Sequence, residues 1–340
     1  MKKILPNIRQ LCVNEKGQNY WFNGCMEYLM ECLGEDIKVY DYYFFSNVTG
    51  DSLMQLFSKD LRTCAYSPSD NVFDEDFARR AFDACGYEFE YITNITDANR
   101  ADFIPRIKAS IDKGIPVINM DRSIPICGYD GDEFYYLVCN EPIETGLKKV
   151  PNTFTKLIFV GAKKEKPPLR EVYKKAVMDI PSFITRPSTD KYSFGKQAFV
   201  DWAESFQNGT FDDVPVEKIG GGGGYGNAWL VHGTYLCMAG TNGCADDLLW
   251  RAKTWNPDME PLINELLPLY KKHQEVFHDL AYRTANGETD YRNGGMNGGF
   301  RIKPETIKDK SAMKAVSEKI MESAKVCDEI LAVFEKYAKR

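Results

Sequence analysis

Residues 115–139 read IPVINMDRSIPICGYDGDEFYYLVC, and this stretch decides the fold class of the first half of the chain. The apolar run from Ile115 to Met120 predicts a buried strand. Glu133 to Cys139 predicts a second strand, and the Asp130-Gly131-Asp132 turn before it is typical of a hairpin. A third strand is expected from Thr155 to Val160. Helical patterns alternate with these strands, so the sequence predicts a mixed α+β fold here.

Two helices are expected beside these strands. Asn23-Gly24-Cys25 leads into the first, whose apolar positions from Met26 to Leu33 follow a helical spacing. Apolar residues from Phe103 to Ile111 predict the second, and a glycine follows the end of each helix. We therefore expect residues 1–162 to form one α+β domain.

The second half reads differently, because from Pro167 onward its apolar residues recur with the 3.6-residue period of helices. The charged, proline-terminated segment Lys163–Pro168 is typical of a linker, so residues 163–340 are expected to form a helical domain. Glycine-rich loops at 220–224 and 293–299 interrupt the helices. Neither loop matches a phosphate-binding motif, so no cofactor is expected. The expected helices of this domain are residues 229–238, 245–255, 259–283 and 312–337.

Composition excludes several classes of function. The chain has 340 residues, of which 43 are lysine or arginine and 49 are aspartate or glutamate, giving a formal net charge of −6. This balance lacks the positive surface that holds a phosphate backbone, so nucleic acid is not an expected partner. No run reaches the roughly 18 apolar residues of a membrane span, and no apolar core follows the N-terminal lysines. We therefore expect no membrane partner and a cytoplasmic location.

Ten cysteines are scattered without CxxC pairs, which favours reduced thiols over a disulfide framework and argues against cysteine-bound metal. Histidine does not supply a metal site either. His273 and His278 are five residues apart, so their side chains diverge on a helix. We expect both histidines to lie on the solvated surface, and we expect no metal.

Cys25 is the strongest candidate for chemistry. Its expected place at a helix N-terminus favours the thiolate, because the partial positive charge of the helix stabilises an anion there. The amides of Gln18, Asn19 and Asn23 precede it and are suited to stabilising an oxyanion in acyl transfer. The alternative is a cysteine that fills space in the core, since cysteine is among the most frequently buried residue types.

Four short motifs carry a resemblance to a known family. They are Asn23-Gly24-Cys25-Met26-Glu27-Tyr28-Leu29, Pro116-Val117-Ile118, Ile126-Cys127-Gly128-Tyr129-Asp130-Gly131-Asp132 and Val138-Cys139-Asn140-Glu141-Pro142. In this order they resemble the C39-like papain fold. More narrowly, the chain resembles the butirosin biosynthesis protein H N-terminal type, in which a cysteine-protease-like domain precedes a helical domain. The resemblance implies acyl-group chemistry on a small molecule or peptide.

The resemblance also implies which residues would act. The family machinery is a helix-start cysteine, a histidine that opens the strand before the Gly-Tyr-Asp-Gly turn, and an asparagine or aspartate on the next strand. The first and third correspond to Cys25 and Asn140. The histidine has no counterpart, because that strand begins Asp121-Arg122-Ser123 and the first histidine of the chain is His232.

Three explanations account for the missing base. His232 reaches Cys25 from the helical domain, since geometry and not chain order defines such a site. Alternatively, Asp121 or Arg122 tunes Cys25 directly. In the third explanation the site has lost catalysis and keeps a ligand pocket. The residues expected to contact a ligand are Asn23, Asp121, Arg122 and Arg251, of which the last either extends to solvent or faces a carboxylate.

We therefore expect a papain-like cysteine hydrolase or acyltransferase that acts on an amide or thioester of a small molecule or peptide. Cys25 is the expected nucleophile, Gln18 or Asn19 stabilises the oxyanion, and Asn140 orients the base. The alternative is a catalytically inactive papain-like protein that binds a small ligand. Homo-oligomerisation stays open, because the apolar face of the terminal helix can pack within its own domain or against a second copy.

Overall fold

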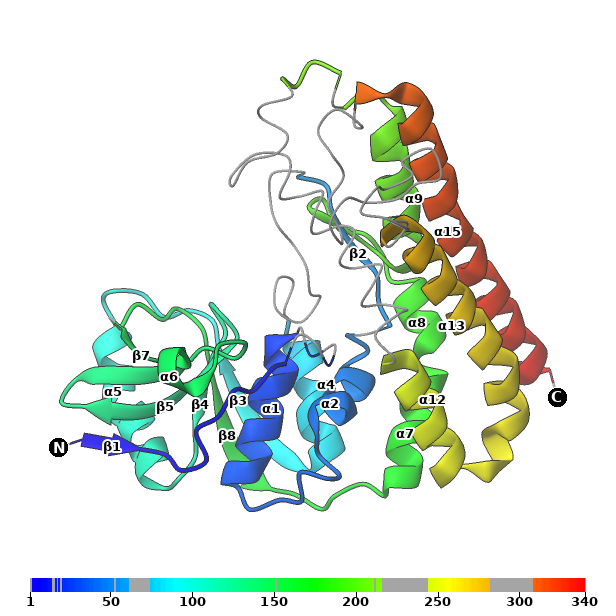
Figure 1. Ribbon diagram of the computed structural model, residues 1–340. Helices are drawn as coiled ribbons and strands as arrows, with labels where there is room; N and C mark the ends of the chain where they lie inside the picture. Colours follow the sequence, from blue (N-terminus) through cyan, green and yellow to red (C-terminus); the bar gives the residue numbers. More distant parts are fainter. Residues whose placement is uncertain are drawn as a thin grey trace. The chain divides into compact units, whose positions relative to one another are not determined.

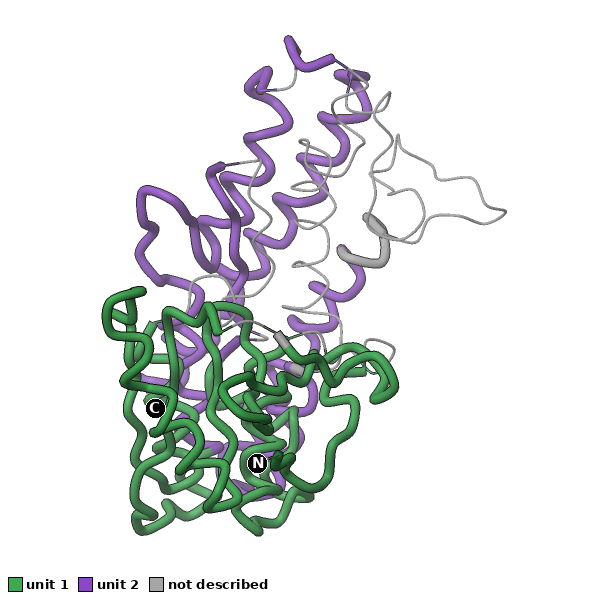
Figure 2. Tube along the Cα trace, turned by 90° about the vertical axis from the view of Figure 1, so that its left-hand side faces the viewer, with its two compact units in different colours: residues 1–49, 72–172 green, residues 50–71, 173–340 purple. Residues whose placement is uncertain are grey.

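The structure is a computed structural model that describes residues 2–13, 16, 18, 20–51, 53–60, 74–150, 152–210, 212–215, 244–281 and 308–339. The chain divides into two compact units (Figure 2). The first consists of Met1–Thr49 and Val72–Val172, and the second of Gly50–Asn71 and Tyr173–Arg340. Each unit is described by itself below.

The first unit is built on an antiparallel sheet with the strand order β3-β8-β4-β5-β6-β7 (Figure 1). A further strand, β1, pairs with β5 beside β4. The strands are β1 (Lys2–Ile4), β3 (Tyr87–Ile92), β4 (Val117–Asn119), β5 (Ile124–Asp130), β6 (Glu133–Leu137), β7 (Leu147–Val150) and β8 (Leu157–Lys163). Every ladder between these described strands is antiparallel, so the unit is a mixed fold of helices and an antiparallel sheet.

The expected hairpin joins β5 to β6. Asp130 pairs with Glu133, and Gly131 between them has a φ of 60°, a conformation that glycine adopts without steric cost. The register shifts between Ile126 and Gly128, which is the point where β1 pairs with the other edge of β5. A Cβ atom on Gly128 would lie 2.6 Å from the carbonyl oxygen of Lys3, so only glycine lets the two strands approach this closely.

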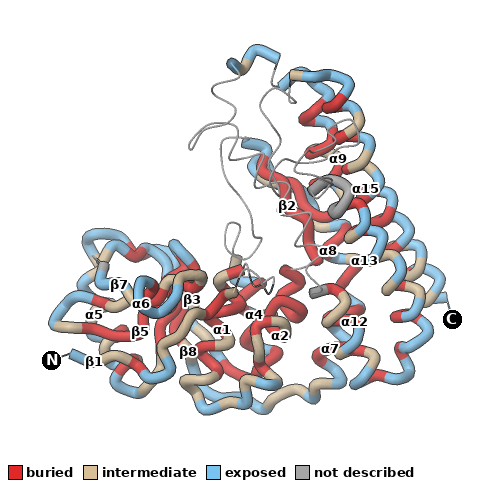
Figure 3. The backbone as a smooth tube through the Cα atoms, in the orientation of Figure 1, coloured by how far each residue is buried: buried red, intermediate tan, exposed pale blue. Residues whose placement is uncertain are grey.

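Helices pack on this sheet and on one another. They are α1 (Trp21–Cys32), α2 (Tyr42–Thr49), α4 (Glu75–Cys85), α5 (Arg100–Asp112) and α6 (Ile143–Gly146). Both α1 and α5 contact β5, while α2 contacts α1 and α4. Much of α1, α2 and α4 is buried (Figure 3). The side-chain oxygen of Asp74 caps α4 by accepting hydrogen bonds from the backbone of Asp76 and Phe77, and Gly86 ends the helix in a left-handed conformation.

The described part of the second unit is mostly helical, with one two-stranded antiparallel sheet. The elements are β2 (Leu56–Ser58), β9 (Tyr192–Phe194), α8 (Ile180–Ile184), α9 (Gly195–Gln207), α12 (Cys244–Trp255), the short 3₁₀ helix η2 (Pro257–Met259), α13 (Glu260–Ala281) and α15 (Lys310–Ala338). The boundary between the units falls within α7 (Leu169–Met178). Helix α15 packs along both α9 and α13, and the buried Trp202 of α9 is the largest side chain of this core.

Several sequence predictions of helices and strands are confirmed. The strands and helices expected within 103–163, and the helices expected at 245–255, 259–283 and 312–337, are present with shifted ends. Residues 50–51 and 53–60 group with the second unit, in which β2 pairs with β9. The helix expected at 229–238 and the glycine-rich loops 220–224 and 293–299 lie outside the described residues.

Candidate functional site

Cys25 lies within α1 and not at its N-terminus, which corrects the sequence prediction. The helix begins at Trp21, so Cys25 is its fifth residue, and its side chain is fully buried with 0% exposure. The charge effect of a helix end fades beyond the first turn. Phe22, Met26 and Leu29 form the apolar stripe that carries the helix into the core. The sequence prediction placed Asn23 in the segment that leads into the helix, whereas it is a buried residue inside α1.

Two thiols and one backbone carbonyl meet beside α1. The Sγ atom of Cys25 donates to the carbonyl oxygen of Ser123 at 3.1 Å. Cys139 places its own Sγ atom 3.7 Å from that of Cys25 and 3.6 Å from the same carbonyl oxygen. The structure therefore brings together α1, the residue before β5 and the residues that follow β6. We call Cys25, Ser123 and Cys139 the thiol cluster.

Ser123 belongs to the segment Asp121-Arg122-Ser123, where the family resemblance leads us to expect a histidine. It immediately precedes β5 and is 1% exposed. Its φ of 50° is unusual for a residue with a side chain. Its buried hydroxyl has no hydrogen-bond partner among the described residues. No imidazole belongs to the first unit at all, because every histidine of the chain follows residue 231.

Asn140 is not the residue that faces Cys25. Its backbone carbonyl accepts a hydrogen bond from Nε2 of Gln10 at 3.3 Å, and its side chain is half-buried. The preceding residue, Cys139, takes the position beside the thiol of Cys25. Both residues lie in the turn that follows β6, where the side chains of adjacent residues have different surroundings. No local sequence signal identifies Cys139, because it lies in the turn that follows β6 and its approach to Cys25 depends on contacts between distant segments.

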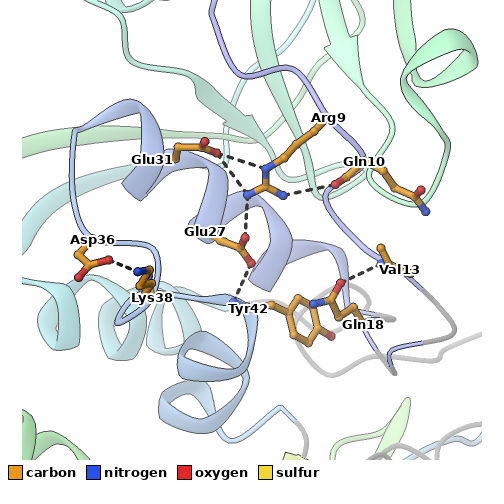
Figure 4. Close-up of polar contacts among 9 residues, drawn as sticks. All are labelled: Arg9, Gln10, Val13, Gln18, Glu27, Glu31, Asp36, Lys38 and Tyr42. Atoms are coloured by element: carbon orange, nitrogen blue, oxygen red, sulfur yellow. Dashed lines mark hydrogen bonds and ion pairs between the residues drawn. The ribbon is translucent and has the colours of Figure 1, made fainter.

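The amides proposed for an oxyanion site have other places. The side-chain oxygen of Gln18 accepts a hydrogen bond from the backbone of Val13 at 3.0 Å (Figure 4). Asn23 is fully buried within α1. Asn19 lies outside the described residues. Of the three amides, Gln18 is tied to its own loop, and Asn23 has no exposure to a ligand in solution.

Asp121 and Arg122 occupy the turn between β4 and β5, and both are exposed. The carboxylate of Asp121 accepts hydrogen bonds from the backbone nitrogen of Thr155, at 2.5 Å, and from its hydroxyl. These contacts connect the turn to the segment before β8. Nearby, burial raises the pKa of the Tyr136 hydroxyl to about 12, although a hydrogen bond with Asn119 opposes this. Asp121 and Arg122 therefore lie on the same turn as Ser123, whose carbonyl oxygen accepts the hydrogen bond from Cys25.

A second cluster on α1 was missed in the sequence, and we call it the Arg9 cluster. The guanidinium of Arg9 donates to Glu27 at 2.7 Å and to Glu31 at 3.3 Å (Figure 4). The other oxygen of Glu27 accepts the backbone N–H of Tyr42, at the start of α2, at 2.8 Å. Burial raises the pKa of Glu27, and the charge of Arg9 opposes the rise. The cluster fixes α1 against α2 and the N-terminal segment.

The remaining candidates lie in the second unit. Arg251 pairs with Asp247 on its own helix at 2.8 Å and donates to the hydroxyl of Tyr173 at 3.4 Å. His273 is buried and not solvated, contrary to the prediction. Its ring stacks on Phe199 with a centroid distance of 5.6 Å, and burial lowers its pKa to about 4. His232 and the side chain of His278 lie outside the described residues.

The described residues hold no group of three ligating side chains arranged for a metal ion. Within the same part of the chain, no helix is both long and apolar enough to cross a membrane. Comparison with known proteins adds no assignment: no protein-family model matches the chain, and neither does any curated protein. The arrangement of the thiol cluster is therefore the basis for a functional proposal.

Proposed function

We propose that the first unit is a papain-like scaffold that binds a small ligand without performing acyl chemistry. One observation carries this proposal: the thiol of Cys25 is fully buried and donates its hydrogen to the backbone carbonyl of Ser123. Cysteine catalysis needs a thiolate and a base that accepts its proton. A carbonyl oxygen accepts a hydrogen bond but does not take up the proton. Ser123 therefore provides no base that takes the proton of Cys25 in acyl transfer.

The turn that ends at Ser123 supports a choice of ligand class. Arg122 is exposed on this turn, and Asp121 beside it is engaged with Thr155. A guanidinium group recognises carboxylates and phosphates through paired hydrogen bonds. The proposed ligand is accordingly a small anionic molecule with a carboxylate, held by Arg122.

One observation supports a second candidate function, a cysteine hydrolase or acyltransferase. The three segments that the family resemblance requires, namely the cysteine helix, the start of one strand and the end of the next, converge within 3.7 Å of the sulfur of Cys25. A cysteine hydrolase or acyltransferase on this framework needs an imidazole from outside the first unit, and His232 is the candidate. Under this alternative, an amide or thioester substrate would acylate Cys25.

One experiment separates the two functions. The full-length protein is incubated with a panel of small acyl thioesters, and its intact mass is followed over time. The expected result is no acyl adduct on Cys25 and no difference in thioester loss between the native protein and Cys25→Ser. Cys32→Ser, on the same helix, is the matched control. An adduct on Cys25, with turnover lost in Cys25→Ser and kept in Cys32→Ser, would establish the enzyme.

Ligand binding is measured independently by thermal shift with a panel of small carboxylates. The expected result is at least one compound that raises Tm for the native protein and not for Arg122→Gln. Lys113→Gln removes an exposed charge from the end of α5 and serves as the control. A panel without any stabilising carboxylate contradicts the proposed ligand class.

A further inference from the structure

Cys25 and Cys139 are brought together by the fold from positions 114 residues apart in sequence. Their sulfur atoms are separated by 3.7 Å, and both side chains are fully buried. A disulfide bond has an S–S length of about 2.05 Å. Each sulfur would therefore move by less than about 1 Å to form the bond, a distance within reach of small side-chain rotations.

The surroundings of these thiols differ from an ordinary apolar core. Both sulfurs lie against one acceptor, the carbonyl oxygen of Ser123, at 3.1 and 3.6 Å. Ser123 adopts a positive φ and buries a hydroxyl that has no partner among the described residues. Backbone strain and unsatisfied polar groups concentrate where a protein does chemistry or changes state. Here both features belong to Ser123, the residue whose carbonyl oxygen the two thiols share.

A third cysteine lies close by without completing a metal site. The Sγ atom of Cys12 is so near α1 that a Cβ atom on Gly24 would lie 2.5 Å from it. Cys12 and Cys139 are also joined through the backbone, since the nitrogen of Cys12 donates to the carbonyl of Cys139 at 2.8 Å. The described residues contain no trio of ligands with metal geometry. Thiol oxidation is thus the chemistry that this arrangement favours.

We propose that Cys25 and Cys139 form a reversible disulfide when the protein meets a hydroperoxide. One sulfur, as its thiolate, attacks a peroxide oxygen, the O–O bond breaks, and the products are a sulfenic acid and hydroxide, which takes up the thiol proton as water. The second sulfur attacks the sulfenic sulfur, the S–S bond forms, and a second water leaves. Two thiols are oxidised by two electrons in total and hydrogen peroxide is reduced to two waters. A dithiol reductant reverses the bond by exchange.

Burial determines which oxidant fits. Both thiols have no exposed surface, so bulky reagents reach them only when α1 opens locally. Hydrogen peroxide has two heavy atoms and is the smallest probe of this chemistry. This inference does not depend on the proposed function, because the bond forms whether or not a carboxylate binds at Arg122.

The test uses the reduced full-length protein, titrated with hydrogen peroxide and then blocked with N-ethylmaleimide. Peptides are analysed by mass spectrometry without reduction. The expected result is a Cys25–Cys139 linked peptide as the most abundant disulfide, with an intact mass lower by about 2 Da and full recovery after dithiothreitol. Cys32→Ser, the control on α1, should give the same linked peptide.

Two variants test the sulfenic acid step, taking Cys25 as the sulfur that reacts with the peroxide. In Cys139→Ser, the sulfenic acid on Cys25 has no second thiol to react with, so the amount of dimedone adduct on Cys25 should increase. Cys25→Ser should give no linked peptide with Cys139. Separate alkylation of Cys25 and Cys139 after peroxide treatment overturns the proposal, and so does a linked peptide that appears only in urea. If either variant fails to fold, as judged by circular dichroism, the titration of the native protein decides alone.

Discussion

The two faces of α1 are held by opposite kinds of contact. On one face the thiol cluster consists of neutral groups, packed without solvent around the carbonyl of Ser123. On the other face the Arg9 cluster joins Glu27 and Glu31 through ion pairs at 2.7 and 3.3 Å. The stability that a neutral packed face provides depends on how closely the side chains fill the available volume. The stability that a charged face provides depends on each charge having a partner. Substitutions on the two faces should therefore fail in different ways.

The largest effect is expected from Gly24→Ala, which adds one methyl group where α1 packs against Leu11 and Cys12. The new Cβ atom would lie 2.5 Å from the sulfur of Cys12 and 3.1 Å from the backbone oxygen of Leu11. We expect the free energy of unfolding to fall by about 3 kcal/mol, because overpacking forces neighbouring groups to shift. Urea denaturation measures it. The double variant Gly24→Ala/Cys12→Ala should recover part of the loss, and equal losses in both proteins would mean that the sulfur is not the obstacle.

On the charged face, Arg9→Met leaves Glu27 partly buried without its guanidinium. The expected loss is about 2 kcal/mol at pH 7, less than for a fully buried ion pair because solvent reaches both groups. The loss should shrink as pH falls, because burial raises the pKa of Glu27 and the protonated carboxyl no longer needs the guanidinium. Arg79→Met breaks an exposed pair with Glu75 on α4 and should cost under about 0.5 kcal/mol. Equal losses for the two arginines would show that burial of Glu27 does not matter.

His273, a buried titratable group in the second unit, is expected to make the stability of the fold depend on pH. The pKa of His273 is about 4, lowered by burial from 6.5. Between these values the unfolded chain binds more protons than the folded one, so stability falls as pH decreases from 6.5 to 4. A loss of about 2 kcal/mol is expected across this window. The stability profile of His273→Phe should be flatter there; an unchanged slope would assign the pH dependence to other groups.

The smallest effect is expected at Glu35, beyond the end of α1. Burial alone would raise its pKa, but hydrogen bonds from Lys163, Lys166 and Tyr87 together lower it from 4.5 to about 2. A lowered pKa stabilises the fold above pH 4.5, and this contribution is lost as pH falls toward 2. We expect about 1 kcal/mol after screening by solvent. Denaturation of Glu35→Gln between pH 5 and 2 measures the contribution, and a variant with the native slope contradicts it.

Sequence patterns predicted the elements whose signals are local. The Asp130-Gly131-Asp132 turn identified the β5–β6 hairpin, and Gly34 and Gly114 follow the helices that they were expected to end, each in a left-handed conformation. Such signals depend on the conformational freedom of a few neighbouring residues. The mixed fold class of the first unit was predicted from these local signals, because apolar residues recur with clearly different periods in helices and in strands.

The candidate site was predicted less well, because its geometry depends on contacts between distant segments. Cys25 was correctly placed on a helix, but its burial follows from the packing of α1 on β5, which periodicity does not specify. Cys139 was overlooked for Asn140 through an offset of one residue. His273 looked solvated among charged neighbours, yet it stacks on Phe199 of another helix. In each case the missing information was the identity of the partner.

The pairing of β2 with β9 has a consequence for how the chain folds during synthesis. Roughly 130 residues separate Ser58 from Tyr192. At synthesis rates of about 5–20 residues per second, β9 is synthesised on the order of ten seconds after β2. The residues of the first unit are complete by Val172, so that unit is able to fold while the buried side chains of Leu56 and Phe57 still lack their neighbours. During this interval β2 is an apolar strand edge, and a chaperone that binds nascent chains would recognise it.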